Sequence, residues 1–279
     1  MSKYMVVPAM IVVMFVGLVP LFAMINYSVQ TPYAVENVFV GFGNFLRVLT
    51  DQRFLDSLRR TVIFSFTVLA LELPLGLMFA LLLYEKGKLN AVISTIIIIP
   101  ALLPPISIGL LWRLLIRGSG PIGQLAAIFF PSYNPFQNAA HAYYTILAMD
   151  VWHWTSLITI VVSAGLAGMD RNPILSAKTE GATRWQIFRH IELPAIQFPL
   201  VFVSLLRLID GLKIYDEVLV LVAGGPGLTN EYVSLFIKTK TVEEWLVGFG
   251  AATSLFYLFI VLMLCYMLLI VMTRGKGVV

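Results

Sequence analysis

The sequence predicts an all-α, polytopic membrane protein with about six transmembrane helices and both termini in the cytoplasm. Two observations support this fold class. Hydrophobic residues make up 59% of the 279 positions, whereas about 45–50% is usual in soluble domains. Apolar runs about long enough to cross a bilayer also recur along the whole chain. We expect these runs to be helices, because a helix satisfies its own backbone polar groups inside the hydrocarbon.

The first apolar run, Met5–Met24, follows a short basic start at Lys3. A cleaved signal peptide is the alternative interpretation. A retained span is favoured, because the run is longer than a usual signal core and lacks a small-residue cleavage site. The remaining predicted spans are Thr61–Leu83, Ala91–Ile116, Tyr143–Met169, Phe198–Val222 and Phe249–Met272.

An even number of spans places both termini on one side of the membrane, and we assign that side to the cytoplasm. Basic residues divide almost evenly between the loops of the two sides, so charge alone does not decide the orientation. Residues 1–279 are expected to form a single transmembrane domain. The proline cluster Pro100, Pro104 and Pro105 is expected to kink the third span.

Two outer segments have a character of their own. The Tyr33–Arg60 segment carries apolar residues at loosely helical spacing, which indicates an interfacial helix leading into the second span. The Arg117–His141 segment is punctuated by proline and glycine and is expected to form an outer cap.

Composition excludes several function classes. The net charge is only +4 and no basic run occurs, so nucleic acid is not an expected partner. The single cysteine, Cys265, excludes an internal disulfide and a cysteine metal cluster, and no other metal site is expected. Catalytic triads and zinc-protease motifs are not found. The phosphate-binding pattern G-x-x-x-x-G-K-[ST] does not occur either, so we expect no cofactor on this chain.

The loop 170–194 is polar within an otherwise apolar chain. Asn172 followed by Pro173 predicts a helix start with Asn172 as N-cap. Gly181 is expected to break that helix, and Thr183 with Gln186 fits a capping box for a second one. The second helix is expected to stop at Leu193-Pro194, because the residue before proline is driven out of the α region.

The second helix of this loop has two interpretations. Trp185, Phe188 and Ile191 fall on one stripe, which suits a helix lying on the membrane surface. The same stripe suits a knob that docks its aromatic side chains into a groove of a partner protein. The pattern alone does not choose between them.

The stretch "EGATRWQIFRHIELP" resembles the cytoplasmic loop that is characteristic of the permease subunits of binding-protein-dependent ABC importers. The matching residues are Glu180, Gly181, Ala182, Trp185, Phe188, Ile191, Leu193 and Pro194. Leu175 departs from the pattern, since that family usually has glutamate there. Gly224–Gly227 and the segments "NFLRVLTDQRFLDSLRRTVIFS" and "TNEYVSLFIKTKTVEEWLVGFGAATS" are similar to the sugar and glycerol-phosphate, maltose-permease-like branch.

This resemblance implies a function and a set of partners. It implies half of a translocation pathway for a carbohydrate, polyol or phosphorylated polyol, in the plasma membrane of a bacterium or archaeon. The implied partners are a second homologous permease subunit, a dimeric ATP-binding subunit that holds ATP and Mg²⁺, and an extracytoplasmic solute-binding protein, all in contact with membrane lipid. Loop 170–194 would couple the ATPase to the spans, with Trp185 and Phe188 as anchors, Gly181 as elbow, and Glu180 and Arg184 as polar contacts.

Ionisable residues inside apolar spans are costly and mark either a pathway or an ion pair. Arg207, Asp210 and Lys213 are spaced by three and could simply neutralise one another on one helix face. The aromatic residues of "DVWHW" could be interfacial anchors. The alternative is a polyol pathway in which carboxylates accept hydroxyl hydrogen bonds and aromatic rings stack on sugar; its candidate residues are Glu72, Asp150, Trp152, His153, Trp154, Asp210 and Lys213.

Two other functions remain open from the residues themselves. An ion-gradient-driven secondary transporter would use Asp150, Asp210 or Lys213 as an ion relay and would be expected to show an internal inverted repeat. A membrane scaffold without transport would leave the charges of the fifth span unexplained.

Overall fold

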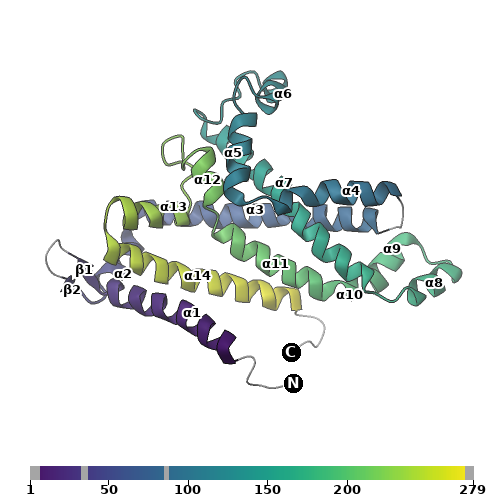
Figure 1. Ribbon diagram of the computed structural model, residues 1–279, viewed down its shortest axis with the longest axis horizontal. Coiled ribbons are helices and arrows are strands. Elements are labelled where there is room, and N and C mark those ends of the chain that lie inside the picture. Colours follow the sequence, from purple (N-terminus) through teal and green to yellow (C-terminus); the bar gives the residue numbers. More distant parts are fainter. Residues whose placement is uncertain (1–6, 33–36, 85–87, 274–279) are drawn as a thin grey trace. The chain divides into compact units, whose positions relative to one another are not determined.

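The computed structural model describes residues 7–32, 37–84 and 88–273, and most of this part of the chain is helical. It divides into two compact units. Unit 1 comprises residues 1–59 and 232–264, and unit 2 comprises residues 60–231 and 265–279. Figure 1 gives the course of the chain and the element labels.

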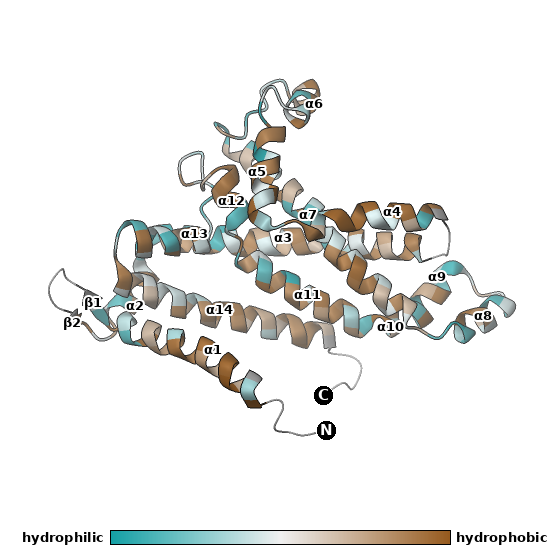
Figure 2. Ribbon diagram, in the orientation of Figure 1, coloured by the Kyte–Doolittle hydropathy of each residue, from teal (hydrophilic) through white to brown (hydrophobic). Residues whose placement is uncertain are grey.

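Four helices within the described ranges are long and apolar enough to cross a membrane. They are α1 (Val7–Ser28), α3 (Gln52–Leu83), α7 (Ala139–Ala167) and α14 (Val247–Thr273). Figure 2 shows hydrophobic colouring along most of α1 and α14. Met5 and Val6, at the start of the predicted first span, lie outside the described residues.

Two bent pairs of helices raise the number of candidate spans among the described residues to as many as six, so the predicted helical, multi-pass membrane fold is confirmed, while the side on which the termini lie stays a prediction. One pair joins α4 (Lys88–Ile98) and the short helix η2 (Ile99–Leu102) to α5 (Pro105–Leu115), with a bend of 103°. The second pair joins residues 184–195 to α11 (Gln197–Leu212), with a bend of 68°.

The predicted kink in the third span is confirmed and has a local cause. Leu103 and Pro104 each precede a proline, and both adopt extended backbone angles, with ψ of 136° and 142°. A residue before proline avoids the α region because the proline ring collides with it. The helix therefore stops at Leu102 and restarts at Pro105 in a new direction.

The fifth span was expected as one helix over Phe198–Val222, and this is wrong. The helix α11 ends at Leu212, and a second short helix, α12 (Asp216–Leu221), begins after a break of three residues. Lys213 and Tyr215 lie in the break and line a polar cavity. Irregular backbone is tolerated at membrane depth where it lines such a cavity rather than facing lipid.

Unit 1 contains a short antiparallel hairpin and an aromatic cluster. β1 (Gln30–Pro32) pairs with β2 (Asn37–Phe39). The Asn44 side chain, on α2 (Gly43–Thr50), donates to the backbone oxygens of Ser28 and Gln30 at 2.9 Å each. Phe54 packs against Phe236 and Phe256, with ring centroids 5.8 and 6.0 Å apart. The other elements of the unit are α13 (Val233–Lys238), the π-helix η4 (Thr239–Glu243) and most of α14.

The helix predicted in the Tyr33–Arg60 segment is present, but it is interrupted. α2 ends at Thr50 and α3 begins at Gln52. The Asp51 carboxylate accepts a hydrogen bond of 2.9 Å from the backbone N–H of Phe54, so it caps the start of α3. The predicted leading helix is therefore α2 plus the first turns of α3, which runs without a break into the second span.

Unit 2 is held together by close helix packing. Its core is formed by Ala80, Ile158, Val162, Leu166, Ile196 and Val203. A Cβ atom placed on Gly76 would lie 2.4 Å from Cγ2 of Ile158, so the Ile158 side chain of α7 packs directly on the backbone of α3 at Gly76. Small residues allow this approach between membrane helices. Beyond the core, the segment expected as an outer cap contains a helix, α6 (Pro121–Phe129).

Candidate functional site

The polar loop of unit 2 begins with a helix that starts one residue earlier than predicted. α8 spans Asn172–Thr179, and its N-cap residue is Arg171 rather than Asn172. The Asp170 carboxylate accepts from the backbone N–H of Asn172 at 3.0 Å. An aspartate two residues upstream therefore satisfies the exposed donor, while Pro173 occupies the first turn as expected.

The predicted glycine elbow and capping box are both present. Gly181 has φ of +83°, a conformation that residues with a Cβ atom avoid. Thr183 then caps α9 (Arg184–Ile187): its hydroxyl accepts from Gln186 N at 3.3 Å, and the Gln186 side chain accepts from Thr183 N at 2.7 Å. The two helices are thus joined by a turn of fixed direction.

The predicted stop at Leu193-Pro194 is wrong. Helical backbone continues as a π-helix, η3 (Phe188–Glu192), into α10 (Leu193–Ala195). Leu193 keeps helical angles, and its N–H donates to Phe188 O. The π turn ends at Glu192, and Pro194 stands in the first turn of α10, a position where a missing N–H is tolerated. The bend comes later, between Ala195 and Gln197.

Glu192 is a functional candidate that sequence reasoning missed. Its side chain is buried and forms an ion pair with Arg184, one of the residues expected to contact the ATPase. Arg184 precedes Glu192 by eight residues, about two helical turns, and that spacing was the available signal. The pair ties the first turn of α9 to the end of η3.

The aromatic residues of the loop have different environments. Trp185 is 64% exposed, and its ring centroid lies 5.4 Å from that of Phe188. Glu180 is also exposed, whereas Ile187 is buried. Ala182, Phe188, Ile191 and Leu193 are half-buried and Pro194 is exposed. Trp185 is therefore available to a partner. Figure 1 places α8 and α9 beyond the end of α10, away from α5, α6 and α12.

A second candidate site is an ion cluster around Arg207 in the middle of unit 2. The Arg207 side chain is only 1% exposed. It donates to both carboxylate oxygens of Glu72, at 2.7 and 2.9 Å, and to Asp150 at 2.8 Å. A fourth bond of 2.8 Å reaches Asp210. One guanidinium thus binds three carboxylates, and Glu72 and Asp150 are themselves buried.

Aromatic and histidine side chains complete this Arg207 cluster. The guanidinium carbon lies 4.7 Å from the centre of the Trp154 ring, which suits a cation–π contact. His153 is buried, with Nδ1 3.5 Å from Glu217. Trp152 lies apart, because it is half-exposed and packs on Trp112 at 6.1 Å between ring centroids.

The predicted charge pairing in the fifth span is partly confirmed. Arg207 and Asp210 are paired as their spacing of three indicates. Lys213 forms no ion pair within the described residues, because α11 ends at Leu212 and Lys213 leaves that helix face. Sequence reasoning could not foresee that Glu72 and Asp150 bind the same arginine, since 135 and 57 residues separate them from it.

A cavity of about 100 Å³ adjoins the Arg207 cluster. Asp150 and Trp154 of α7 and Asp210 of α11 form part of its wall, together with Pro105, Lys213, Ile214, Tyr215, Asp216 and Glu217. Carboxylates, an ammonium group and two aromatic rings therefore surround one small space. Within the described residues, the acidic and histidine side chains form no group suited to a metal ion.

Comparison with known proteins bears on the whole chain. The family model described as "Binding-protein-dependent transport system inner membrane component" matches residues 72–274. The chain is 32% identical to the trehalose/maltose transport system permease protein MalF of Thermococcus litoralis, over 92% of this chain and 88% of the relative. It is 27% identical to a probable ABC transporter permease protein, y4oQ, of Sinorhizobium fredii, over 97% and 89% of the two chains.

The fold is also found among solved structures. A chain of a bacterial ABC transporter involved in the import of alginate superimposes with a TM-score of 0.84, covering 98% of this chain and 95% of that one, at 18% identity. The chain is a multi-pass protein of the inner membrane and a transport subunit rather than an enzyme. It belongs to the family of binding-protein-dependent transport system inner membrane components, as a permease subunit of an ABC importer.

Proposed function

We propose that this permease subunit forms half of a translocation pathway for a carbohydrate or polyol. It would pair with a second homologous permease subunit, receive the solute from an extracytoplasmic solute-binding protein, and be driven by a dimeric ATPase that holds ATP and Mg²⁺. Both termini and loop 170–194 would face the cytoplasm. The relatives named for trehalose and maltose support the solute class.

The observation that carries this proposal is the cavity beside the Arg207 cluster. Its wall offers the carboxylates of Asp150, Asp210 and Glu217 as acceptors for hydroxyl groups. Trp154 and Tyr215 supply aromatic surface of the kind that packs on the C–H face of a sugar ring. A site with convergent polar groups and aromatic walls is the usual form of a small-molecule site.

The charge of the cavity favours an uncharged solute over a phosphorylated one. Four carboxylates line it, those of Asp150, Asp210, Asp216 and Glu217, against the single ammonium group of Lys213. Arg207 is already bonded to three carboxylates and offers little further positive charge. A phosphate group would meet surplus negative charge in a space that water only partly screens.

Loop 170–194 would transmit the closing of the ATPase to the spans. The capped α9, the Arg184–Glu192 pair and the elbow at Gly181 make the loop a shaped unit. Its exposed Trp185 suits an anchor in a partner's groove. α9 continues through η3 and α10 toward α11, which carries Arg207 and Asp210. A push on the loop would therefore reach the cavity along one helical path, which bends by 68° where it enters α11.

The solute class is tested by isolating the complex from native membranes with this chain as bait. We expect an ATPase, a second permease and a solute-binding protein to co-purify. Neutral sugars or polyols, and not their phosphorylated forms, should raise the melting temperature of the binding protein. Uptake that needs a proton gradient and no ATPase would instead support an ion-driven carrier.

The coupling role is tested in the same complex with Trp185→Ala and Gly181→Trp. We expect ATP hydrolysis to continue while solute uptake falls, because the anchor or the elbow is lost. The control is Trp245→Ala, which removes a comparably exposed indole (76%) outside the loop. Normal uptake by both loop variants would rule out the coupling role.

A further inference from the structure

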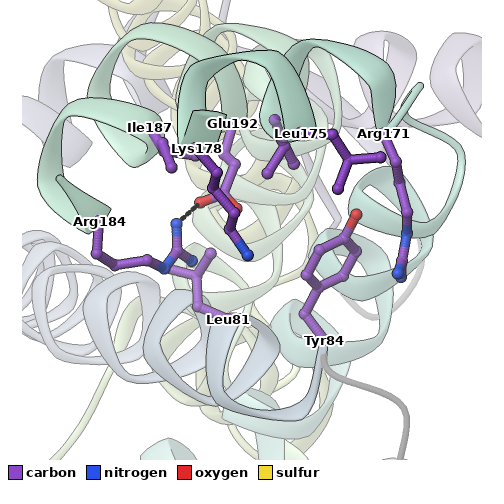
Figure 3. A pocket seen from close by; sticks show the side chains of 9 residues that line it. Leu81, Tyr84, Arg171, Leu175, Lys178, Arg184, Ile187 and Glu192 are labelled. Carbon is purple, nitrogen blue, oxygen red and sulfur yellow. Dashed lines mark hydrogen bonds and ion pairs between the residues drawn. The ribbon is translucent and has the colours of Figure 1, made fainter. Parts of the chain in front are cut away.

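A second cavity, of about 180 Å³, lies between the loop helices and the end of α3. Leu81 and Tyr84 form its α3 side, and the rest of its lining comes from Arg171, Ile174, Leu175, Lys178, Arg184, Ile187 and Glu192. Figure 3 shows the basic side chains of the loop reaching toward this space.

The cavity carries a surplus of positive charge. Arg184 is neutralised by Glu192. Arg171 and Lys178 form no ion pair within the described part of the chain, and both line the same space. Arg171 and Lys178 thus face a small cavity on whose wall Glu192 is the one carboxylate among the residues that the structure describes. An anion would supply the missing countercharge.

A hydroxyl donor completes the site. The oxygen of Tyr84 is buried and has no hydrogen-bond partner among the described residues. The Arg171 guanidinium carbon lies 4.8 Å from the centre of the Tyr84 ring and holds it in place. Figure 3 shows the hydroxyl directed toward the side where Arg171 and Leu175 lie. A buried polar atom without a partner is costly, and a bound acceptor would relieve that cost.

We propose that this cavity binds a phosphate group, carried either by an anionic lipid headgroup or by a soluble phosphorylated metabolite. The phosphate oxygens would accept hydrogen bonds from Lys178, Arg171 and Tyr84. Leu81, Ile174 and Leu175 would pack against the part of the ligand that carries the phosphate. A headgroup fits because basic pockets at the cytoplasmic side of membrane helices bind anionic lipids.

Such a ligand would join α3 to the loop and so restrain the element that we propose couples transport to the ATPase. This regulatory consequence, and the cytoplasmic position that favours a lipid headgroup, rest on the proposed function, whereas the binding of a phosphate group does not. The binding is therefore tested on the full chain alone, without the other subunits, and a failure there leaves the coupling role untouched.

The full chain in phosphatidylcholine nanodiscs is titrated with inorganic phosphate and with glycerol 3-phosphate, and its melting temperature and the amide exchange of residues 171–192 are followed. A parallel sample contains phosphatidylglycerol in the nanodisc. Saturable protection by the soluble phosphates identifies a metabolite site, whereas protection by phosphatidylglycerol alone identifies a lipid site. No protection in either sample overturns the proposal.

Variants separate this site from general surface charge. We expect Lys178→Gln to weaken binding about tenfold or more, where tenfold corresponds to about 1.4 kcal/mol. Tyr84→Phe removes only the hydroxyl, keeps the ring under Arg171 and should also weaken binding. Arg189→Gln is the matched control, because Arg189 is exposed on the same loop and does not line the cavity. An equal loss of phosphate-binding affinity in Lys178→Gln and Arg189→Gln would overturn the proposal.

Discussion

Arg207→Met should destabilise unit 2 strongly, because it removes the guanidinium that binds both Glu72 and Asp150. The side chains of both carboxylates are at most 2% exposed. Removing one partner of a buried ion pair typically costs about 3–5 kcal/mol, since the remaining charge is left without compensation. Methionine fills much of the arginine's volume, so the loss of stability reports the missing charge more than the missing packing.

Asp210→Asn provides the internal comparison. Asp210 binds the same guanidinium at 2.8 Å, but its side chain is 43% exposed. Water can replace much of that interaction, so the expected cost is about 1 kcal/mol or less. At about 2–4 °C per kcal/mol for a domain of this size, Arg207→Met should lower the melting temperature by roughly 6–20 °C and Asp210→Asn by at most about 4 °C.

A compensating variant separates uncompensated charge from lost shape. Arg207→Met combined with Glu72→Gln and Asp150→Asn removes the buried charges together and keeps similar side-chain volumes. Replacing a whole buried ion pair is often close to neutral for stability, so the triple variant should recover at least about half of the loss. Solute uptake should not recover, because the proposed polar wall of the cavity is gone.

The assay is the melting temperature of the purified full-length chain in detergent, followed by size-exclusion profiles after heating. Arg207→Met melting within 2 °C of the wild type, or no better recovery in the triple variant, would refute this account of the cluster. Equal effects of Arg207→Met and Asp210→Asn would refute the argument from burial.

Three further outcomes are expected. Gly76→Val should lower the melting temperature by an amount equivalent to roughly 1–3 kcal/mol, because the new side chain meets Ile158 at the contact of α3 and α7; Gly17→Ala, in open space on α1, should not lower it. Thr183→Ala should cost about 1 kcal/mol, seen as faster amide exchange in α9; unchanged exchange would show that the capping box does not hold the loop. Burial raises the pKa of Tyr133, so its stabilising contribution is complete below its ordinary pKa of about 10 and is lost as the pH rises through the folded-state pKa. The melting temperature of Tyr133→Phe should therefore fall less between pH 9 and 11 than that of the wild type. An equal fall in both proteins would contradict this.

Local patterns in the sequence were sufficient for much of the loop. Gly181, the capping box of Thr183 and the kink at Pro104 involve residues within a few positions of one another, and all three are present. The errors at Asn172 and Pro194 were also local. Asp170, upstream of Asn172, accepts the hydrogen bond from the exposed N–H of Asn172. At Pro194, the chain stays helical after a π turn instead of ending the helix before the proline.

The candidate sites required the tertiary structure. Asp150 and Trp152 lie two residues apart, yet only Asp150 faces Arg207, because successive positions on a helix point in different directions. Likewise, no sequence pattern joins Tyr84 to Arg171 and Lys178, which form the second cavity only because the end of α3 lies beneath α8.

The sequence by itself determined the membrane-spanning helical architecture, the glycine elbow and capping box of loop 170–194, and the family resemblance, since each of these rests on composition or on neighbouring residues. Only the tertiary structure decided that one buried arginine binds three carboxylates and that two basic side chains of the loop share a cavity with a tyrosine of α3. The physical reason is that the energy of a buried charge depends on which groups surround it in space. Helix packing sets those neighbours, and their separation along the chain does not reveal them.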